Sequence, residues 1–238
     1  MRGRQLWRSL LAEWLGSALL AAVVIGSGIA AQRLSPGDTG LQLFENAAVT
    51  AAGLYALILI FGPVSGAHFN PVVSFVDAAL RRTDWRVALA YLPAQVIGCI
   101  CGAVLANVMF SLPAVTISTH DRISGGHFLA EGVATAGLLL VIFSLLRSRR
   151  DIAVAPAVGA YIGAAYWFTS STSFANPAIT IGRMFSNTFA GIAPSSAPVF
   201  IAAQAVGALV GYALIQILYP TPKIQGTPTP PIPAEEVA

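Results

Sequence analysis

Long apolar runs with almost no charged residue dominate the pattern of the chain, and their lengths suit helices that cross a membrane. A helix needs about 20 apolar residues to cross a hydrocarbon core of roughly 30 Å. The pattern predicts six spans, which lie in Trp14 to Ala31, Asn46 to Val76, Val87 to Thr119, Gly132 to Leu146 (preceded by the apolar His127 to Ala130), Ile152 to Gly182 and Ala197 to Tyr219. We therefore expect an all-α membrane protein.

Two of these runs are too long for a single crossing, and each contains one Asn-Pro pair. The runs Asn46 to Val76 and Ile152 to Gly182 have 31 residues each, and the pairs are Asn70-Pro71 and Asn176-Pro177. Asn is favoured at the N-cap of a helix and Pro at its first position, so each run predicts a full span followed by a short helix that begins at the pair. One such pair would fit an ordinary capped helix in a buried loop, whereas two matched pairs favour half-helices.

The second half of the chain repeats features of the first half in the same order. Glu13 near the start of the first span matches Glu131 near the start of the fourth, and Pro93 to Gly98 matches Ala202 to Gly207. Because each copy has three spans, an odd number, the second copy is expected to lie upside down relative to the first, as in inverted-repeat transport proteins. The two half-helices then enter from opposite faces, and their N-termini meet near the midplane.

The repeat divides the chain into five regions. They are a cytoplasmic N-terminus (1–9), a first three-helix repeat with a half-helix from Asn70 (10–118), an outer connecting loop (119–126), a second, inverted repeat with a half-helix from Asn176 (127–219) and a disordered cytoplasmic tail (220–238). The tail is rich in Pro and Thr, and its apolar content is too low for it to pack.

The basic residues set the expected orientation, because cytoplasmic loops carry an excess of Lys and Arg. They gather before the first span and after the second, fourth and sixth, at Arg2, Arg4, Arg8, Arg81, Arg82, Arg86, Arg147, Arg149, Arg150 and Lys223. The alternate loops carry only Arg33, Arg122 and Arg183. Both termini are therefore expected in the cytoplasm, and the short loops favour a bacterial inner (plasma) membrane.

Two carboxylates, Glu13 and Glu131, are embedded near the predicted spans. They could be proton or ion sites, or each could accept hydrogen bonds from backbone N–H groups of a re-entrant loop and hold it in place. The repeat relates the two glutamates to each other as it relates the two loops, which favours the supporting role. His68, just before Asn70, is assigned to the same loop support.

Composition and charge exclude several other classes of protein. Of the 238 residues, 56% are hydrophobic and 10% are charged, which is far from the composition of a soluble domain. The net charge of +3 lies in short loops, without the basic and aromatic surface typical of nucleic-acid binding.

Three arginines before an apolar run also fit a cleaved signal peptide, although this run is long and holds Glu13. Cys99 and Cys101 point apart on one span, so neither a disulfide nor a metal site is expected.

Two short segments on this repeat resemble the signature boxes of the aquaporin and aquaglyceroporin family. They are Ser65 to Val72 (Ser-Gly-Ala-His-Phe-Asn-Pro-Val) and Phe174 to Ala178 (Phe-Ala-Asn-Pro-Ala). The resemblance extends over residues 10 to 219 and departs from the usual pattern at Val72, where the family usually has Ala. It implies an aquaporin-like inverted repeat of six transmembrane helices plus two re-entrant half-helices, with one pore per subunit of a homotetramer. The implied pore residues are Asn70, Pro71, Val72, Asn176, Pro177 and Ala178.

The resemblance also implies a selectivity filter near the outer mouth. Members similar to water channels or glycerol facilitators carry Arg three residues after the second Asn, with aromatic residues opposite, and here that position is Ile179. A gap-free count from the boxes assigns Thr50, Ala164 and Ser173 to the other three positions. Such a filter has no cation and no aromatic ring, so we expect it to be wide and weakly polar.

Arg183 lies one helical turn after Ile179 and is expected in the outer vestibule. There it either attracts anions or partly replaces the missing filter Arg. Alternatively, it is an interfacial arginine that contacts loops or lipid headgroups.

The segment from Ile181 to Met184, together with Asn187 to Pro194, resembles a bacterial subgroup often associated with arsenic-resistance genes. Arsenous acid is largely un-ionised at neutral pH and is polyhydroxylated like glycerol. The sequence therefore predicts a passive channel for glycerol-like polyols, arsenite or other metalloid hydroxides, and water. We expect it to lie in a lipid bilayer and to pass small neutral solutes, with no nucleic acid, cofactor or metal.

A coupled secondary transporter is the alternative, since such proteins also use inverted repeats and broken helices. It would need a titratable or ion-binding group that moves with the substrate, and only Glu13, Glu131 and His68 are candidates. An ion channel would need rings of charge or a carbonyl filter. No nucleophile, base and orienting acid stand at a meaningful spacing, so an enzyme is not expected.

Overall fold

The computed structural model describes residues 3–220, and every regular element in that range is a helix. The elements are α1 (Gly3–Leu34), α2 (Thr39–Ser65), α3 (Pro71–Ala79), α4 (Trp85–Met109), α5 (Gly125–Arg147), η1 (Asp151–Ala153), α6 (Val154–Phe168), α7 (Pro177–Gly182), η2 (Arg183–Phe185) and α8 (Ala197–Leu218). Arg2, Lys223 and the predicted tail from residue 221 onward lie outside the described residues.

Six of the helices are long and apolar enough to cross a membrane, and two are about half that length or less. The six are α1, α2, α4, α5, α6 with η1, and α8. The helices α3 and α7 have 9 and 6 residues. This division confirms the predicted six transmembrane helices and two re-entrant half-helices.

Most of the α-helices begin at a polar residue whose side chain caps the first turn. Asp38 accepts a hydrogen bond from Leu41 N at 2.9 Å and begins α2. Asp84 begins α4, and Ser124 accepts from His127 N at 3.0 Å to begin α5. Each cap satisfies a backbone N–H that the first turn of a helix leaves without an intrahelical partner.

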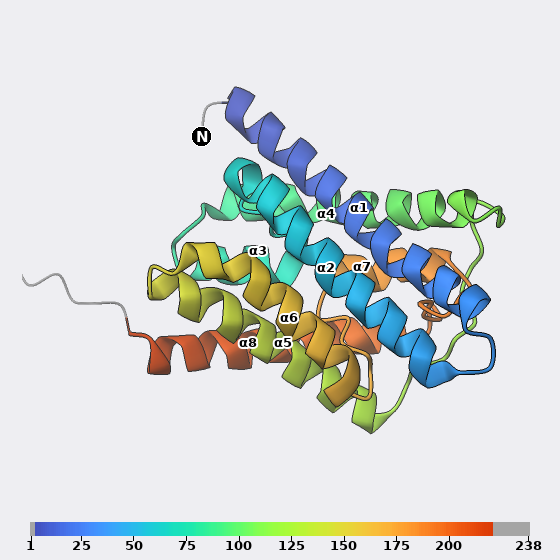
Figure 1. Cartoon of the computed structure of the whole chain (residues 1–238). Coiled ribbons are helices and arrows are strands. Elements are labelled where there is room, and N and C mark those ends of the chain that lie inside the picture. The colour runs from blue at the N-terminus through green and yellow to red at the C-terminus, as the bar shows by residue number, and fades with distance from the viewer. Residues whose placement is uncertain (1–2, 221–238) are drawn as a thin grey trace, which may run out of the picture.

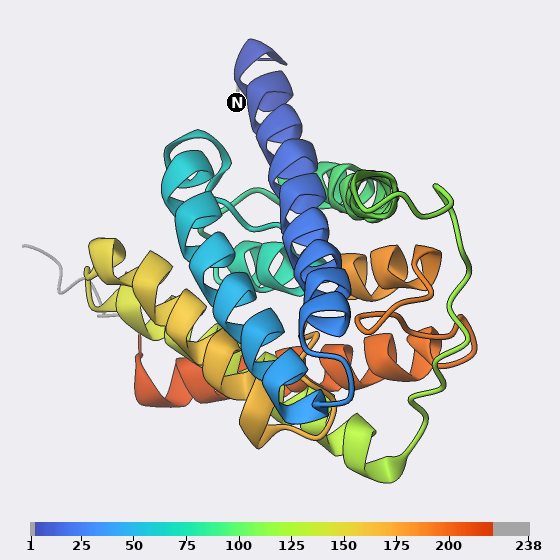
Figure 2. The same cartoon turned by 45° about the vertical axis from the view of Figure 1, so that its right-hand side comes forward.

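The internal repeat is visible in the packing. In the first half α1 packs on α4, in the second half α5 packs on α8, and α2 packs on α6 between the halves. Figures 1 and 2 show α3 and α7 inside the surrounding long helices, end to end and pointing in opposite directions. The two half-helices therefore lie one after the other along the interior.

Glycines allow the closest helix contacts, at matching positions of the two repeats. A Cβ atom on Gly98 of α4 would lie 3.0 Å from Cβ of Ser17 on α1, and one on Gly207 of α8 would lie 2.9 Å from Cβ of Thr135 on α5. These distances are too short for a side chain. The glycines thus allow close packing of these membrane helices.

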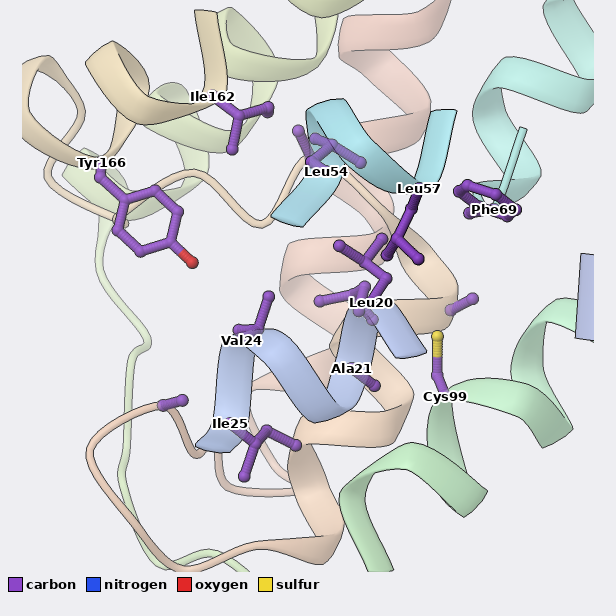
Figure 3. Close-up of a cluster of buried hydrophobic side chains, with 14 of the residues drawn as sticks. Leu20, Ala21, Val24, Ile25, Leu54, Leu57, Phe69, Cys99, Ile162 and Tyr166 are labelled. Atoms are coloured by element: carbon purple, nitrogen blue, oxygen red, sulfur yellow. The ribbon is translucent and has the colours of Figure 1, made fainter. Parts of the chain in front are cut away.

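A mainly apolar cluster of residues links α1, α2 and α6 at the centre of the bundle. Figure 3 shows Leu20 and Val24 of α1 near Leu54 of α2, with Ile162 and Tyr166 of α6 facing them. The Tyr166 ring is buried, and its hydroxyl points inward. These side chains form one wall of the cavity described next.

Candidate functional site

The two half-helices meet at their N-termini through the predicted asparagines. Asn70 is the N-cap of α3, where its Oδ1 accepts from Val72 N at 3.1 Å. Asn176 is the N-cap of α7, where its Oδ1 accepts from Ala178 N at 2.9 Å. Pro71 and Pro177 follow as first helical residues, as the Asn-Pro pattern predicts.

Each asparagine also reaches across to the loop of the other repeat. Asn70 Nδ2 donates to the carbonyl of Ala175 at 2.8 Å, and Asn176 Nδ2 donates to the carbonyl of Phe69 at 2.8 Å. The amide of Asn70 is therefore oriented by two hydrogen bonds, and that of Asn176 by three, because Asn176 Oδ1 also accepts from Ile179 N at 3.2 Å. The reciprocal pair ties the two half-helices together at the centre of the molecule.

Glu131 anchors the loop before α7. Its two carboxylate oxygens accept hydrogen bonds from Ser171 Oγ (2.6 Å), Phe174 N (2.8 Å), Ala175 N (2.9 Å) and Gln204 Nε2 (2.7 Å). The residue is fully buried. A carboxylate that accepts this many hydrogen bonds is held in one position.

Glu13 anchors the loop before α3 in the same way. It accepts from Ser65 Oγ (2.6 Å), His68 N (2.9 Å), Phe69 N (2.7 Å) and Gln95 Nε2 (2.7 Å). The structure thus places both glutamates in the loop-supporting role, and His68 contributes to it through its backbone N–H.

The two loops share an unusual backbone, which these bonds stabilise. Ala67 and Phe69 have φ of 50° and 49°, and the equivalent Ser173 and Ala175 have φ of 50° and 47°. Left-handed backbone is uncommon for residues other than glycine. The loops hold it in both repeats because Glu13 and Glu131 fix their N–H groups.

A cavity of about 140 Å³ runs past the junction of the half-helices. Most of its wall is apolar, with side chains from α1, α2, α5 and α6. Its polar lining comprises Thr50, His68, Asn70, Asp77, Tyr166, Ser173, Asn176 and Arg183. An apolar tube with a few polar groups suits solutes that carry hydroxyl groups but no charge.

Three of the four predicted filter residues line this cavity. Thr50, Ser173 and Ile179 are buried and contribute to its wall. The Oγ atom of Ser173 has no hydrogen-bond partner among residues 3–220. Ile179 supplies an apolar surface where the resemblance would place an arginine.

Ala164 does not line the cavity, and its assignment needs correction. It lies on an exposed face of α6, whereas Tyr166, two residues later, is buried and contributes to the cavity wall. Two residues correspond to about 200° around a helix, so the gap-free count selected the wrong face. Tyr166 Oη lies 3.3 Å from Thr50 Oγ1, and this part of the cavity therefore contains an aromatic ring, contrary to expectation.

Arg183 is enclosed by protein and lines one end of the cavity. Only 2% of its surface is exposed, and its Nε donates to the carbonyl of Ala190. Its guanidinium carbon lies 3.4 Å from the ring centroid of Phe174, and that of Arg122 lies 5.4 Å from the same ring. Burial excludes contact with a lipid headgroup, whereas the bond to Ala190 is a loop contact, as the second interpretation expects. The vestibule role stays a prediction.

The opposite end of the cavity carries a group that sequence reasoning missed. Asp77 of α3 is buried, lines the cavity and accepts from Arg82 Nε at 3.0 Å. His68 Nε2 lies 4.0 Å from the other carboxylate oxygen of Asp77, and His68 Nδ1 lies 3.0 Å from Ser74 Oγ. A usable signal existed, since Asp77 follows Asn70 by seven residues, as Arg183 follows Asn176.

Within residues 3–220, no group of three or more His, Cys, Asp or Glu side chains is arranged to hold a metal ion. Cys99 is buried and Cys101 is exposed, and both are free thiols.

Comparison with known proteins agrees with this arrangement. Residues 1–170 match the family described as major intrinsic protein. The chain is 47% identical over 218 residues to aquaglyceroporin AqpS of Rhizobium meliloti (strain 1021), which covers 92% of this chain and 93% of that protein. It is 32% identical over 168 residues to aquaporin NIP3-1 of Oryza sativa subsp. japonica, which covers 67% of this chain and 51% of that protein.

The fold is also similar to a solved structure. The X-ray structure of the aquaglyceroporin from Plasmodium falciparum superposes with a TM-score of 0.68 at 22% sequence identity, over 88% of this chain and 95% of that one. At this identity the similarity supports the fold alone.

Proposed function

The chain belongs to the major intrinsic protein family, and we propose that it is a passive channel for glycerol-like polyols, neutral metalloid hydroxides such as arsenous acid, and water. One observation carries the proposal. A cavity with apolar walls and few polar groups passes the point where the two half-helices meet, and both asparagines line it. An uncharged, hydroxylated solute can replace its hydrogen bonds to water with hydrogen bonds to these polar groups.

The bonding of the two glutamates argues against a coupled transporter. Glu13 and Glu131 each accept four hydrogen bonds, and both are fully buried. Protonation of either carboxylate would disrupt the loop that it supports. Neither group is therefore suited to binding and releasing a proton with each solute molecule.

The filter of this channel consists of Thr50, Tyr166, Ser173 and Ile179. Its polar groups are three hydroxyls, two of which, on Thr50 and Tyr166, lie 3.3 Å apart. Ile179 contributes a short apolar side chain in place of a long cation. We expect this filter to admit solutes larger than water and to favour those with several hydroxyl groups.

We propose that the protein lies in a bacterial inner membrane as a multi-pass homotetramer with both termini in the cytoplasm. Arg81, Arg82, Arg86 and Arg147 lie at the ends of spans near the Asp77 end of the cavity, which is therefore cytoplasmic. The Arg183 end is the outer end. The tetramer rests on membership of the family.

Stopped-flow light scattering on proteoliposomes tests the proposal. Gradients of glycerol and arsenous acid should relax faster than in empty liposomes, and Ile179→Arg should slow both solutes because a longer side chain narrows the filter. Ala164→Leu is the matched control, since Ala164 faces away from the cavity. Unchanged solute flux in Ile179→Arg would show that the filter is not where we place it.

A further inference from the structure

The internal repeat places two oppositely charged residues at equivalent positions. Asp77 follows Asn70 by seven residues and Arg183 follows Asn176 by seven, and both line the same cavity. Each lies near a ring that comes two residues before its asparagine. His68 Nε2 lies 4.0 Å from a carboxylate oxygen of Asp77, and the guanidinium carbon of Arg183 lies 3.4 Å from the ring centroid of Phe174. Because the half-helices point in opposite directions, the two charges lie at opposite ends of the cavity.

The charge of Asp77 is compensated by Arg82. Arg82 donates to one carboxylate oxygen at 3.0 Å, and His68 lies beside the other. A carboxylate paired in this way has little net effect on a solute that passes it.

The charge of Arg183 lacks such compensation. No carboxylate lies within salt-bridge distance of it in the described part of the chain, and its one hydrogen bond goes to the neutral carbonyl of Ala190. Glu131 is the nearby acid, and the four neutral donors that hold its oxygens leave its negative charge in place. Arg122, on the same Phe174 ring, adds a second positive charge, so the two arginines exceed the one carboxylate at this end of the cavity.

From this geometry we propose that Arg183 is a charge-selectivity residue of the pore, which excludes cations at the outer end. The inference rests on the proposed channel function. A fixed positive charge in a cavity with apolar walls acts over several ångströms, because little water is present to screen it. Neutral solutes cross this field without a penalty. The filter position at Ile179 carries no charge, so cation exclusion at this end depends on Arg183.

The test compares two solutes of similar size and shape, urea and the permanent cation guanidinium, in proteoliposomes. Urea should cross proteoliposomes with wild-type protein faster than empty liposomes, whereas guanidinium should cross both at the same rate. In Arg183→Gln or Arg183→Met, guanidinium flux should rise about tenfold relative to urea, since loss of one poorly screened charge changes a cation barrier by that order. Arg183→Lys should keep the exclusion because it keeps the charge.

Two further variants separate the charge from the packing of Arg183. Arg33→Gln removes a cation that stacks on Phe110 outside the cavity, and it should leave guanidinium excluded. The double variant Ile179→Arg with Arg183→Gln should restore exclusion by placing a cation one turn away. Glycerol flux shows that the single variants are folded. Thermal unfolding in detergent shows this for the double variant, in which Ile179→Arg is itself expected to slow glycerol. Whichever of the Gln and Met variants conducts glycerol is the one compared.

The outcomes distinguish this inference from the proposed function. If wild-type protein passes neither glycerol nor urea, the channel function fails and the inference falls with it. If glycerol and urea pass but guanidinium stays excluded after Arg183 is neutralised, the channel stands and the inference is overturned. The inference is also overturned if both neutralised variants fail to conduct glycerol while Arg183→Lys passes guanidinium.

Discussion

The side-chain nitrogen of Asn176 lies 2.8 Å from the carbonyl oxygen of Phe69, a residue of the other repeat. The repeat produces the reverse contact between Asn70 and Ala175 at the same distance. Each asparagine therefore has two functions: it caps its own half-helix, and it ties that half-helix to the opposite loop. The centre of the pore is held together by two side chains that also face the solute.

Replacing either asparagine by alanine should destabilise the protein by a similar amount. Asn176→Ala removes a helix cap and leaves the buried carbonyl of Phe69 without its partner, which together cost about 2 to 4 kcal/mol. Asn70→Ala should cost the same within about 1 kcal/mol, because its contacts are equivalent except for the one further bond that Asn176 Oδ1 accepts from Ile179 N. Thermal unfolding in detergent measures both, with Asn187→Ala, in an exposed loop, as the control. A clear difference between the first two variants would contradict the symmetry.

Glu131→Gln should prevent folding rather than alter transport. Four donors converge on the carboxylate, and a glutamine would direct its own N–H₂ group at one or more of them. Leaving buried donors unpaired in this way costs about 3 kcal/mol or more. The measurement is the yield and unfolding temperature of purified protein. Glu45→Gln is the control, since Glu45 accepts one described hydrogen bond, from Ser35. A folded Glu131→Gln protein whose solute flux has lost a pH dependence would instead identify Glu131 as a proton site.

Tyr166→Ala should widen the pore, whereas Ala164→Phe should leave it unchanged. Tyr166 is 3% exposed, lines the cavity and contacts the hydroxyl of Thr50, while Ala164 faces outward two residues away. The ratio of xylitol to glycerol flux in proteoliposomes reports the width. Removing the ring should raise that ratio severalfold. Equal effects of the two substitutions would mean that α6 is rotated from the orientation described.

Gly207→Ala and Gly62→Ala should change stability in opposite directions. A Cβ on Gly207 would lie 2.9 Å from Cβ of Thr135, and the resulting strain between α8 and α5 should cost about 1 to 3 kcal/mol. A Cβ on Gly62 meets nothing within 4 Å, and alanine there should stabilise α2 by about 0.5 kcal/mol. Unfolding temperatures of the two variants decide this, and an equal decrease in both would contradict the packing at Gly207.

The long helices and the half-helices could be predicted from the sequence because their signals are local. The length of each apolar run predicts a span. The pairs Asn70-Pro71 and Asn176-Pro177 each supply the N-cap and the first residue of a half-helix. The odd number of spans per repeat then determines the inversion. The support of the loops by Glu13 and Glu131 followed from the same symmetry.

The walls of the pore were harder to predict, for a physical reason. In a membrane the lipid-facing side of a helix is as apolar as the side that lines an apolar cavity, so periodicity did not separate Ala164 from Tyr166. The cavity side of α6 is visible only in the structure, at Val154, Val158, Ile162 and Tyr166. Similarly, the charge of Asp77 was visible in the sequence, but its contacts depend on how the loop places His68.

A passive pore and a coupled transporter differ in whether solute movement depends on any gradient other than that of the solute. Glycerol flux into proteoliposomes would be measured over a range of glycerol gradients, with and without imposed proton and sodium gradients. A passive pore predicts a rate that rises in proportion to the glycerol gradient, is unaffected by either ion gradient and stops when the concentrations are equal. Accumulation of glycerol above the outside concentration, driven by a proton or sodium gradient, would contradict the passive channel and establish coupled transport.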